Sequence, residues 1–370
     1  MVIGHHLEPN SGMNQRRGKP CHVEIGLPLL VVMAALLEIG CGWSQIGKST
    51  QTGACTVGVS AVACLSSTRT IVVAQDGSGQ YTSIQPALSA AQAGDTIEVK
   101  NGTYSEALAI TNSGEPNRPI MLVNYPGTNP LIAPPCTASG QTVNLIGSWL
   151  VLSGFEITTG WDGIDVYGSN NLVTNNYIHD TCGQGVLVIS AHDVAITGNR
   201  IASNGLLNPS NCHFHGIYFS DFYLKGMYNL SVIGNSFSNS AGAGIQSWDP
   251  SARKRNLLIE NNTFTNDSFE IIFTNTDSTT VRGNTFVHDS YPATSFAQSA
   301  ILWLEADTNI SFSNNKFQYG ITEPATGSTA NYIVYTNQPN TGVTFAADTW
   351  SVPAGFPTTN DAIVAALFAQ

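Results

Sequence analysis

The chain has 370 residues, of which 42% are hydrophobic and only 11% are charged, and its formal net charge is −11. This balance argues against a nucleic-acid-binding protein, which needs basic surface to neutralise phosphates. One large folded domain preceded by a leader accounts for the length.

Residues 1–41 have the pattern of an export signal. Three cations between residues 13 and 19 form a basic region, and Leu27 to Leu37 form an apolar stretch with the length of a signal rather than a membrane span. Cys41 follows in a sequence similar to a bacterial lipoprotein processing site, although Glu38 does not fit that pattern. Lipidation of Cys41 and plain cleavage are both open, and both predict an extracellular or cell-envelope protein whose only membrane contact is a lipid anchor.

Residues 42–69 are small and polar, and we expect a linker or tether there. The folded domain then begins with strand-like segments around an amphipathic helix, predicted at about Ile84 to Ala91. A helix in this place would cover the first strands and leave no open edge. At the other end, residues 360–370 are amphipathic and are predicted to form a C-terminal cap.

Residues 70–359 are organised by a short repeat. Two motifs recur: an Asn-centred one (TNNYI at 174–178, TGNRI at 197–201, ENNTF at 260–264, SNNKF at 313–317) and an apolar one (DGIDV at 162, QGVLV at 184, HGIYF at 215). From Asn176 to Asn199 is 23 residues, and from Asn262 to Asn284 is 22. Several short strands and no helix per repeat predict an all-β solenoid, with the Asn residues stacked as a hydrogen-bonded ladder at one corner.

These motifs resemble the repeats of right-handed parallel β-helix proteins in the pectate-lyase-like superfamily, over about residues 70 to 350. The predicted helix resembles the N-terminal cap of that superfamily. The resemblance implies a right-handed single-stranded parallel β-helix. It does not imply one activity, because this fold carries lyases, hydrolases, esterases, epimerases, adhesins and phage spikes. The signature motifs of pectin methylesterases, polygalacturonase-type hydrolases and mannuronan epimerases are absent from the sequence.

Two cysteines occupy nearly the same place on neighbouring repeats. Cys182 lies four residues before Val186, and Cys212 lies five residues before Ile217. We therefore predict a disulfide between Cys182 and Cys212. A cysteine-based metal site is the weaker interpretation, because the sequence contains no CxxC pair.

Two neighbouring repeats have longer turns than the others. Between the inward apolar residues of consecutive strands most repeats use 9 to 11 residues, whereas these two use 15 and 14, and the extra residues, 220–229 and 248–256, are expected to project side by side. After Cys41 the chain has eleven Lys and Arg against 22 Asp and Glu, and four of the eleven cations fall in these two turns. A basic ledge on an acidic protein suits an acidic polysaccharide as partner.

Lys225 and Arg253 lie at equal offsets in the two turns. In β-helix lyases of the alginate lyase and chondroitinase type, a Lys and an Arg on neighbouring coils act with Ca²⁺ to remove the proton beside a uronate carboxylate. By this resemblance Lys225 is the base and Arg253 neutralises the carboxylate. Asp221 and Asp249, with Asn275 and Glu305 at the same offset on later coils, are the candidate oxygen ligands for this Ca²⁺.

The predicted substrate contacts are Arg255, Lys254, Tyr223, Trp248 and His215. The cations extend the ledge, the aromatic rings offer flat faces to sugar C–H groups, and the histidine can transfer protons. Each has a structural alternative. The cations can be solvated turn residues, the rings can stack on each other, the histidine can pack beside Gly216, and the carboxylates can cap turns.

The sequence therefore predicts a carbohydrate-active protein, as a polysaccharide lyase-like enzyme that cleaves an acidic, uronate-containing polysaccharide by β-elimination. A non-catalytic glycan-binding or adhesin-type scaffold is the alternative. Cations and carboxylates that converge in one groove would favour the enzyme, and scattered charges on a flat face would favour the scaffold. We expect a monomer.

Overall fold

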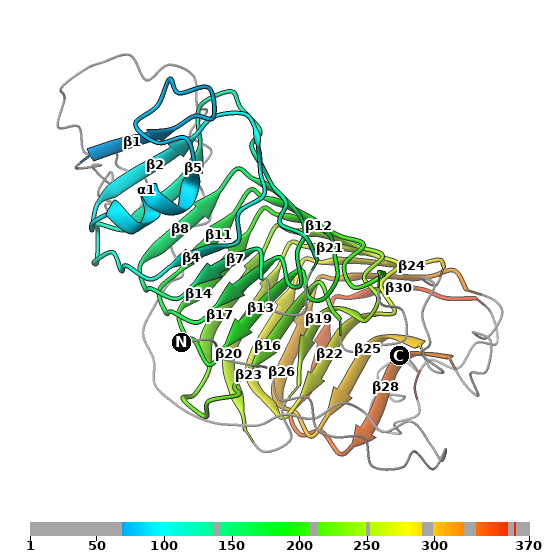
Figure 1. The fold of residues 1–370 in the computed structure, drawn as a ribbon. Coiled ribbons are helices and arrows are strands. Elements are labelled where there is room, and N and C mark those ends of the chain that lie inside the picture. The colour runs from blue at the N-terminus through cyan, green and yellow to red at the C-terminus, as the bar shows by residue number, and fades with distance from the viewer. Residues whose placement is uncertain are drawn as a thin grey trace, which may run out of the picture.

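The computed structural model describes residues 69–136, 141–207, 214–248, 252–290, 299–321 and 331–353, together with Thr359. The chain winds into a right-handed solenoid whose walls are three long parallel sheets (Figure 1), so the predicted parallel β-helix is confirmed. The predicted export signal, most of the linker and the predicted C-terminal cap lie outside the described residues. In the part that the structure describes, no helix is long and apolar enough to cross a membrane.

Within the described residues, each complete coil contributes one strand to each of three sheets, which are named A, B and C here, and the coils at the two ends are incomplete. The eleven strands of sheet A are β1 (Arg69–Val73), β2 (Asp95–Val99), β5 (Ile120–Asn124), β8 (Leu150–Ser153), β11 (Leu172–Thr174), β14 (Val194–Thr197), β17 (Tyr228–Ile233), β20 (Lys254–Glu260), β23 (Thr276–Arg282), β26 (Thr308–Ser313) and β29 (Thr344–Ala346). The ten strands of sheet B are β3 (Thr103–Tyr104), β6 (Leu131–Ile132), β9 (Glu156–Thr159), β12 (Tyr177–Thr181), β15 (Arg200–Ala202), β18 (Ser236–Ser238), β21 (Thr263–Thr265), β24 (Thr285–His288), β27 (Lys316–Tyr319) and β30 (Thr349–Ser351). The nine strands of sheet C are β4 (Leu108–Ile110), β7 (Val143–Leu145), β10 (Ile164–Val166), β13 (Val186–Ile189), β16 (Ile217–Ser220), β19 (Ala243–Ser247), β22 (Phe269–Thr274), β25 (Ser299–Glu305) and β28 (Asn331–Gln338).

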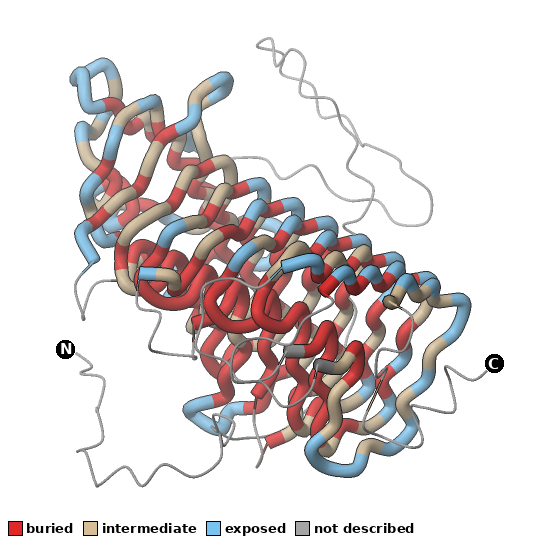
Figure 2. The backbone as a smooth tube through the Cα atoms, turned by 90° about the vertical axis from the view of Figure 1, so that its right-hand side faces the viewer, coloured by how far each residue is buried: buried red, intermediate tan, exposed pale blue. Residues whose placement is uncertain are grey.

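The core runs along the inside of the coil, where buried residues follow one another through the centre of the molecule (Figure 2). Because neighbouring strands pair in register, like residues stack on like: Ile164 lies opposite Val186, which lies opposite Ile217. The rings of Phe237, Phe264 and Phe286 stack with centroids 4.6 and 4.8 Å apart, close to the spacing of paired strands.

The helix α1 (Ile84–Ala90) covers the first coils, as predicted. Its buried side chains are Ile84, Ala87 and Leu88, which join the core. The carboxylate of Glu106 accepts hydrogen bonds from the backbone N–H groups of Ile84 and Gln85 at 2.7 and 2.9 Å, so a side chain from the next strands satisfies the start of the helix.

The predicted asparagine ladder lies at the corner between sheets A and B. The side-chain oxygen of Asn262 accepts the backbone N–H of Asn235 at 2.8 Å and its side-chain N–H at 3.0 Å, and the amide of Asn262 donates to Asn284 at 3.0 Å. The same contacts link the corner residues 176, 199, 235, 262, 284 and 315, and Asp348 accepts the last pair. The residue before each ladder asparagine, such as Asn261 or Gly283, has a positive φ, which explains the recurring Asn-Asn and Gly-Asn pairs.

We expect the substitution Asn262→Ala to lower the free energy of unfolding by about 2–4 kcal/mol, because it leaves several buried backbone and amide groups without partners. Asn261→Ala is the matched control, since Asn261 is exposed and has no rung of the ladder, and we expect it to cost about 1 kcal/mol or less for the backbone strain. Denaturant unfolding followed by circular dichroism measures both. Equal losses in the two variants would contradict a stabilising ladder.

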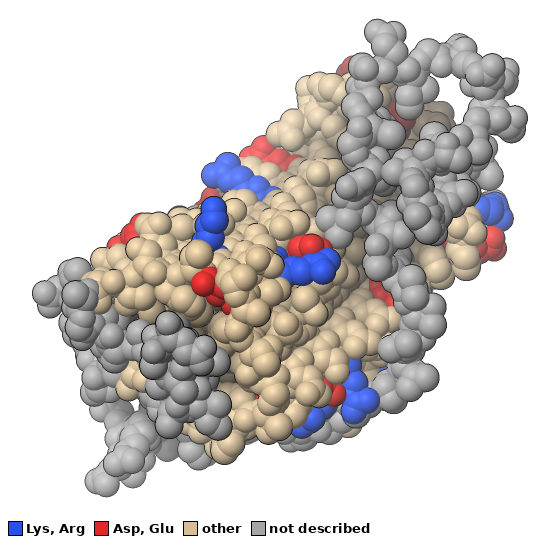
Figure 3. All heavy atoms as spheres, turned by 180° about the vertical axis from the view of Figure 1, so that it is seen from behind, with Lys and Arg blue, Asp and Glu red and all other residues tan. Residues whose placement is uncertain are grey.

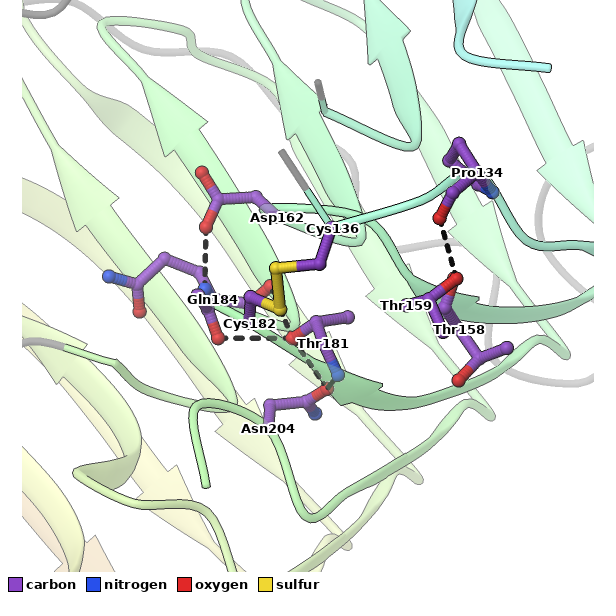
Figure 4. The surroundings of a disulfide bond; sticks show 10 residues. Pro134, Cys136, Thr158, Thr159, Asp162, Thr181, Cys182, Gln184 and Asn204 are labelled. Atoms are coloured by element: carbon purple, nitrogen blue, oxygen red, sulfur yellow. Dashed lines mark hydrogen bonds between the residues drawn. A yellow bond between two sulfur atoms is a disulfide. The ribbon is translucent and has the colours of Figure 1, made fainter. Parts of the chain in front are cut away.

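The predicted disulfide is wrong in its partner. Cys182 is bonded to Cys136, 46 residues earlier, with the two Cα atoms 6.3 Å apart (Figure 4). The chain around Pro134 runs beside the next coil, where Pro134 accepts hydrogen bonds from the side chain of Thr159 at 2.6 Å and from Gly160 N–H at 3.0 Å, and this brings Cys136 over Cys182. The similar positions of Cys182 and Cys212 on adjacent repeats were therefore not sufficient to identify the bonded partner of Cys182. Cys212 itself lies outside the described residues.

Removal of this disulfide by Cys136→Ala should lower the free energy of unfolding by up to about 4 kcal/mol, because the bond closes a long loop in the unfolded chain. Cys212→Ala should have little effect. Peptide mapping without reduction should identify the fragment that joins residues 136 and 182. A fragment joining Cys182 to Cys212 would restore the prediction made from the sequence.

Candidate functional site

The outer face of sheet C carries the groups that are candidates for function. The central residue of each strand points outward, and the register aligns these residues in one row: Asn144, Asp165, Leu187, Tyr218, Gln246, Ile272, Trp303 and Tyr335. Asn144, Leu187, Tyr218 and Tyr335 are partly exposed, whereas Asp165, Gln246, Ile272 and Trp303 are buried. The outer face is therefore open at β7, β13 and β16, and it is closed at β10 and from β19 to β25.

An aromatic cluster covers the outer face of sheet C from β19 to β25. Trp248, Phe269, Ile272 and Trp303 form a second apolar cluster on the outside of sheet C. The ring of Trp303 packs edge-on against Trp248 and Phe269, with centroids 6.2 and 5.4 Å apart. Trp248 is only 1% exposed, so it does not offer the surface ring face for sugar stacking that the sequence predicted.

The turn between β16 and β17, residues 221–227, projects from the edge of sheet C. The Asp221 carboxylate accepts the backbone N–H groups of Lys225 and Gly226 at 3.1 and 2.9 Å, and Leu224 N–H donates to the Asp221 carbonyl at 2.8 Å. Leu224 has a φ of 56°, which costs backbone energy for a residue other than glycine. Asp221 therefore caps this turn, which is the structural alternative to Ca²⁺ binding that the sequence left open.

The side chains of this turn are exposed and mostly apolar. Phe222, Tyr223 and Leu224 are 61%, 41% and 54% exposed. The Lys225 ammonium lies 5.4 Å from the centre of the Tyr223 ring, and the Phe222 ring meets the same ring edge-on at 5.1 Å. Tyr223 N–H donates to Ser190 Oγ at 2.8 Å, which draws the turn back over the preceding coil. The turn therefore presents two aromatic rings and one ammonium group together on the surface of the protein.

The other cations of the predicted ledge lie differently. Arg253 Nε donates to Asn275 Oδ1 at 3.0 Å and its Nη1 to Thr308 Oγ1 at 2.6 Å. Arg255 is in β20, with Nε 3.6 Å from Asp277 Oδ2. Because β17 and β20 pair with Tyr228 opposite Arg255, the turns that hold Lys225 and Arg253 lie on neighbouring coils, as expected.

Lys254 is not on the surface. It begins β20 and is fully buried, so the prediction that it extends a solvent-facing ledge is wrong. The count of extra residues could not distinguish a longer turn from a longer strand, and the strand alternation turns this side chain inward. Its positive charge opposes the rise in pKa that burial causes at Asp221 and at Asp307, where the pKa of Asp307 is still raised to about 8.

On the face shown in Figure 3, charged side chains are few and scattered.

The predicted Ca²⁺ ligands do not converge in the described residues. Asp221 follows β16 and Glu305 ends β25, three strands further along sheet C, so their backbones lie roughly 14 Å apart along the sheet. A single Ca²⁺ would need ligands at about 2.4 Å from both. The described residues contain no group of three or more His, Cys, Asp or Glu that could hold a metal ion. Asp249 lies outside them, so Ca²⁺ binding stays a prediction.

His215 belongs to a column of side chains that ties the coils together. Its backbone N–H donates to Gln184 Oε1 at 2.5 Å, and its ring Nδ1 accepts the backbone N–H of Ala243 at 2.7 Å. In the preceding coil, Asp162 Oδ1 accepts the N–H of Gln184 at 2.5 Å in the same way (Figure 4). His215 is buried and holds the start of one strand against the next, which is a structural role.

Two carboxyl groups in this region were not identified from the sequence. Asp165 Oδ2 accepts a hydrogen bond from the Tyr167 hydroxyl at 3.2 Å, and the other oxygen of Asp165 has no hydrogen-bond partner. Burial raises the pKa of Asp162 to about 7, and burial together with the charge of Asp162 raises the pKa of Asp165 well above its ordinary value. The sequence did distinguish these two carboxyl groups, because DGIDV has aspartates at its first and fourth positions, whereas QGVLV and HGIYF have none.

The raised pKa of Asp162 predicts a pH-dependent stability. The folded state binds the proton more tightly than the unfolded state, so stability is lost as pH rises from about 4 to about 7. Asp162→Asn keeps an oxygen for the Gln184 N–H and removes the titration, and should therefore be more stable than the wild type above pH 7, by up to about 4 kcal/mol. Unfolding at pH 5 and pH 8 measures this, with the exposed Asp180→Asn as control. An unchanged pH dependence would contradict it.

Comparisons with known proteins agree with this architecture. Two family models match the chain: a Pel9A-like right-handed β-helix region at residues 72–215 and a right-handed β-helix region at residues 207–345. The uncharacterized protein YclG of Bacillus subtilis (strain 168) is 30% identical over 153 residues, which cover 37% of this chain and 26% of YclG. The match therefore spans about a quarter of that relative's length.

Solved structures show the same fold at low sequence identity. An alginate lyase from Paenibacillus sp. str. FPU-7 is 18% identical with a TM-score of 0.61, and the match covers 79% of this chain and 97% of that one. The Streptococcus pneumoniae surface protein and adhesin PfbA is 13% identical with a TM-score of 0.50, over 74% of this chain and 93% of that one. Likeness at this level shows a shared fold.

Proposed function

We propose that this right-handed parallel β-helix, which matches right-handed β-helix family models over residues 72–215 and 207–345, is an exported, carbohydrate-active protein of the pectate-lyase-like superfamily that binds an acidic polysaccharide. The binding site comprises the turn 221–227 and the open part of the outer face of sheet C. The observation that carries this proposal is the exposed turn itself, where aromatic rings and an ammonium group stand together on an otherwise acidic protein.

The turn has the chemistry that a uronate requires. The faces of Phe222 and Tyr223 suit the C–H face of a pyranose, and the Lys225 ammonium can pair with the uronate carboxylate. Asp221 holds the turn in one conformation through two backbone hydrogen bonds, so little ordering is required when a sugar binds. The Cys136–Cys182 disulfide supports an extracellular or cell-envelope location, because such bonds persist in oxidising compartments.

The reaction proposed for this site is β-elimination. Lys225 as the free amine takes the C5 proton, the C–H electron pair forms the C4–C5 double bond, and the bond from C4 to the glycosidic oxygen breaks with its pair on that oxygen. Arg253 on the neighbouring coil opposes the charge on the carboxylate. Its guanidinium contacts Asn275 and Thr308, which lie one and two coils further from Lys225, so it leaves these hydrogen bonds when it reaches the same sugar. Ca²⁺ would assist by the same neutralisation, so the assay includes it.

An ultraviolet assay for the unsaturated uronate product tests the reaction. The purified protein is mixed with alginate, pectate and chondroitin sulfate, in Ca²⁺ and in chelator. A rise in absorbance on one polymer supports the lyase and gives its substrate class. No rise on any uronate polymer would refute it.

The substitution Lys225→Met should reduce the elimination rate by at least about 100-fold, because it removes the base. The change lies on an exposed turn outside the core, so the melting temperature should not move. Lys316→Met is the matched control, since Lys316 is exposed on sheet B away from the turn, and it should keep full activity. Full activity in the Lys225 variant would remove this residue from the mechanism.

A glycan-binding scaffold without catalysis is the second candidate. The observation that favours it is that Lys254 is buried while Arg253 and Arg255 contact protein side chains, which leaves Lys225 as the most exposed cation of the predicted ledge. In that case the protein would bind an acidic polysaccharide in affinity electrophoresis, with the binding weakened by Lys225→Met. The absorbance assay would stay flat for every polymer.

A further inference from the structure

The exposed turn after β16 is fastened to the preceding coil at both of its ends. Near its start, Tyr223 N–H donates to Ser190 Oγ at 2.8 Å. Directly after its end, the carbonyl of Tyr228 accepts the N–H of Asp193 at 3.1 Å. In the preceding coil His192 lies between these two anchor points, immediately before Asp193. The exposed turn is therefore held against the segment that carries this histidine.

The imidazole of His192 is held in one orientation. Its ring lies nearly parallel to the ring of Tyr228, with an interplanar angle of 6° and the centroids 4.6 Å apart. Its Nδ1 lies 2.6 Å from Asp193 Oδ2, and the other oxygen of Asp193 accepts the side-chain N–H of Asn229 at 2.8 Å. Because an ionised carboxylate only accepts hydrogen bonds, this contact keeps a proton on Nδ1.

The second ring nitrogen of His192 is available to a ligand. Nε2 makes no hydrogen bond to the described residues, and the side chain is 34% exposed. With Nδ1 protonated, Nε2 of a neutral imidazole accepts a hydrogen bond, for example from a sugar hydroxyl. When the ring takes up a second proton, Nε2–H becomes a donor and the ring carries a positive charge. The ligand that suits His192 therefore changes with its charge.

We propose that His192 is a carbohydrate-contacting residue of the turn site, and that its protonation strengthens the binding of an acidic polysaccharide. This inference rests on the proposed function and adds the regulation of that site by pH. Beside a neutral His192, the Asp193 carboxylate keeps a negative charge that repels a uronate. Protonation cancels this charge, and Nε2–H can then donate to a uronate carboxylate of the chain that Lys225 also contacts.

Other titratable groups lie close enough to require a control. The titratable and charged groups on the elements around His192 are Asp193 on its own segment, Tyr228 and Arg255 on β17 and β20, and Asp221 and Lys225 in the turn. The preceding coil contributes Ser169, whose Oγ accepts the His192 N–H at 3.1 Å. Burial raises the pKa of Asp221, and that of the more distant Asp162 to about 7. A pH effect in the wild type alone would therefore not identify His192.

The test compares binding at pH 5 and pH 8 in low salt, with alginate, pectate and chondroitin sulfate as the probes. Affinity is measured as Kd by calorimetry, or as KM where the polymer is cleaved, and circular dichroism checks the fold at both pH values. On the polymer that binds, the wild type should bind about three- to fivefold more tightly at pH 5, which is the size expected for one exposed ion pair. His192→Gln keeps a polar side chain without the charge and should lose most of this difference.

His179→Gln is the matched control. His179 also pairs with the aspartate that follows it, at 2.7 Å, and stacks on a tyrosine ring at 4.0 Å, but it lies on sheet B away from the turn. It should keep the wild-type pH dependence. His192→Lys provides the opposite change, because a permanent positive charge should give the same affinity at both pH values, close to that of the wild type at pH 5.

Each outcome decides for or against the inference. Equal wild-type affinity at pH 5 and pH 8, or an unchanged pH dependence in His192→Gln, would overturn it and leave the proposed function standing. The same pH dependence with neutral dextran would also overturn it, since that polymer has no carboxylate. If the wild type binds none of the three acidic polymers at either pH, the proposed function fails, and the inference fails with it.

Discussion

The structure depends on the in-register stacking of parallel coils. Because every residue lies above its equivalent in the next coil, a side chain that suits one level must suit its neighbours too. Apolar residues then form continuous stacks, such as Phe237 on Phe264 at 4.6 Å, and polar residues form continuous hydrogen-bonded columns. The asparagine ladder and the Asp162–Gln184–His215 column are the polar versions of this rule.

The same stacking explains why departures from the repeat are informative. Glu270 occupies the register position of Gly244, and its side chain enters the buried interior, 2.8 Å from His288. Burial raises the pKa of Glu270 and lowers that of His288 to about 4, so burial favours the uncharged form of both groups. This pair stabilises an irregular level of the coil, and it is separate from the outer face of sheet C.

The sequence was sufficient for the fold because the repeat is local and periodic. The strand order, the asparagine corner and the helix at 84–90 all follow from patterns within one or two repeats. The site was predicted less well, because its geometry depends on contacts that spacing does not encode. The turn and Lys225 were found from loop length, but the inward direction of Lys254 follows from strand alternation, and the partner of Cys182 came from a segment outside the compared repeats.

The open part of sheet C combines features that reduce stability. Leu224 is a large apolar residue held exposed at a positive φ, where asparagine or glycine would be easier to accommodate. Asp162 and Asp165 are carboxyl groups buried close together, and the second has an oxygen without a partner. Other levels of the same face use Leu187, Tyr218 or Ile272 at the position of Asp165. Leu224 and the Asp165 oxygen without a partner take no part in the stacked columns, and we propose that a ligand bound beside the exposed rings and Lys225 accounts for them better than folding does.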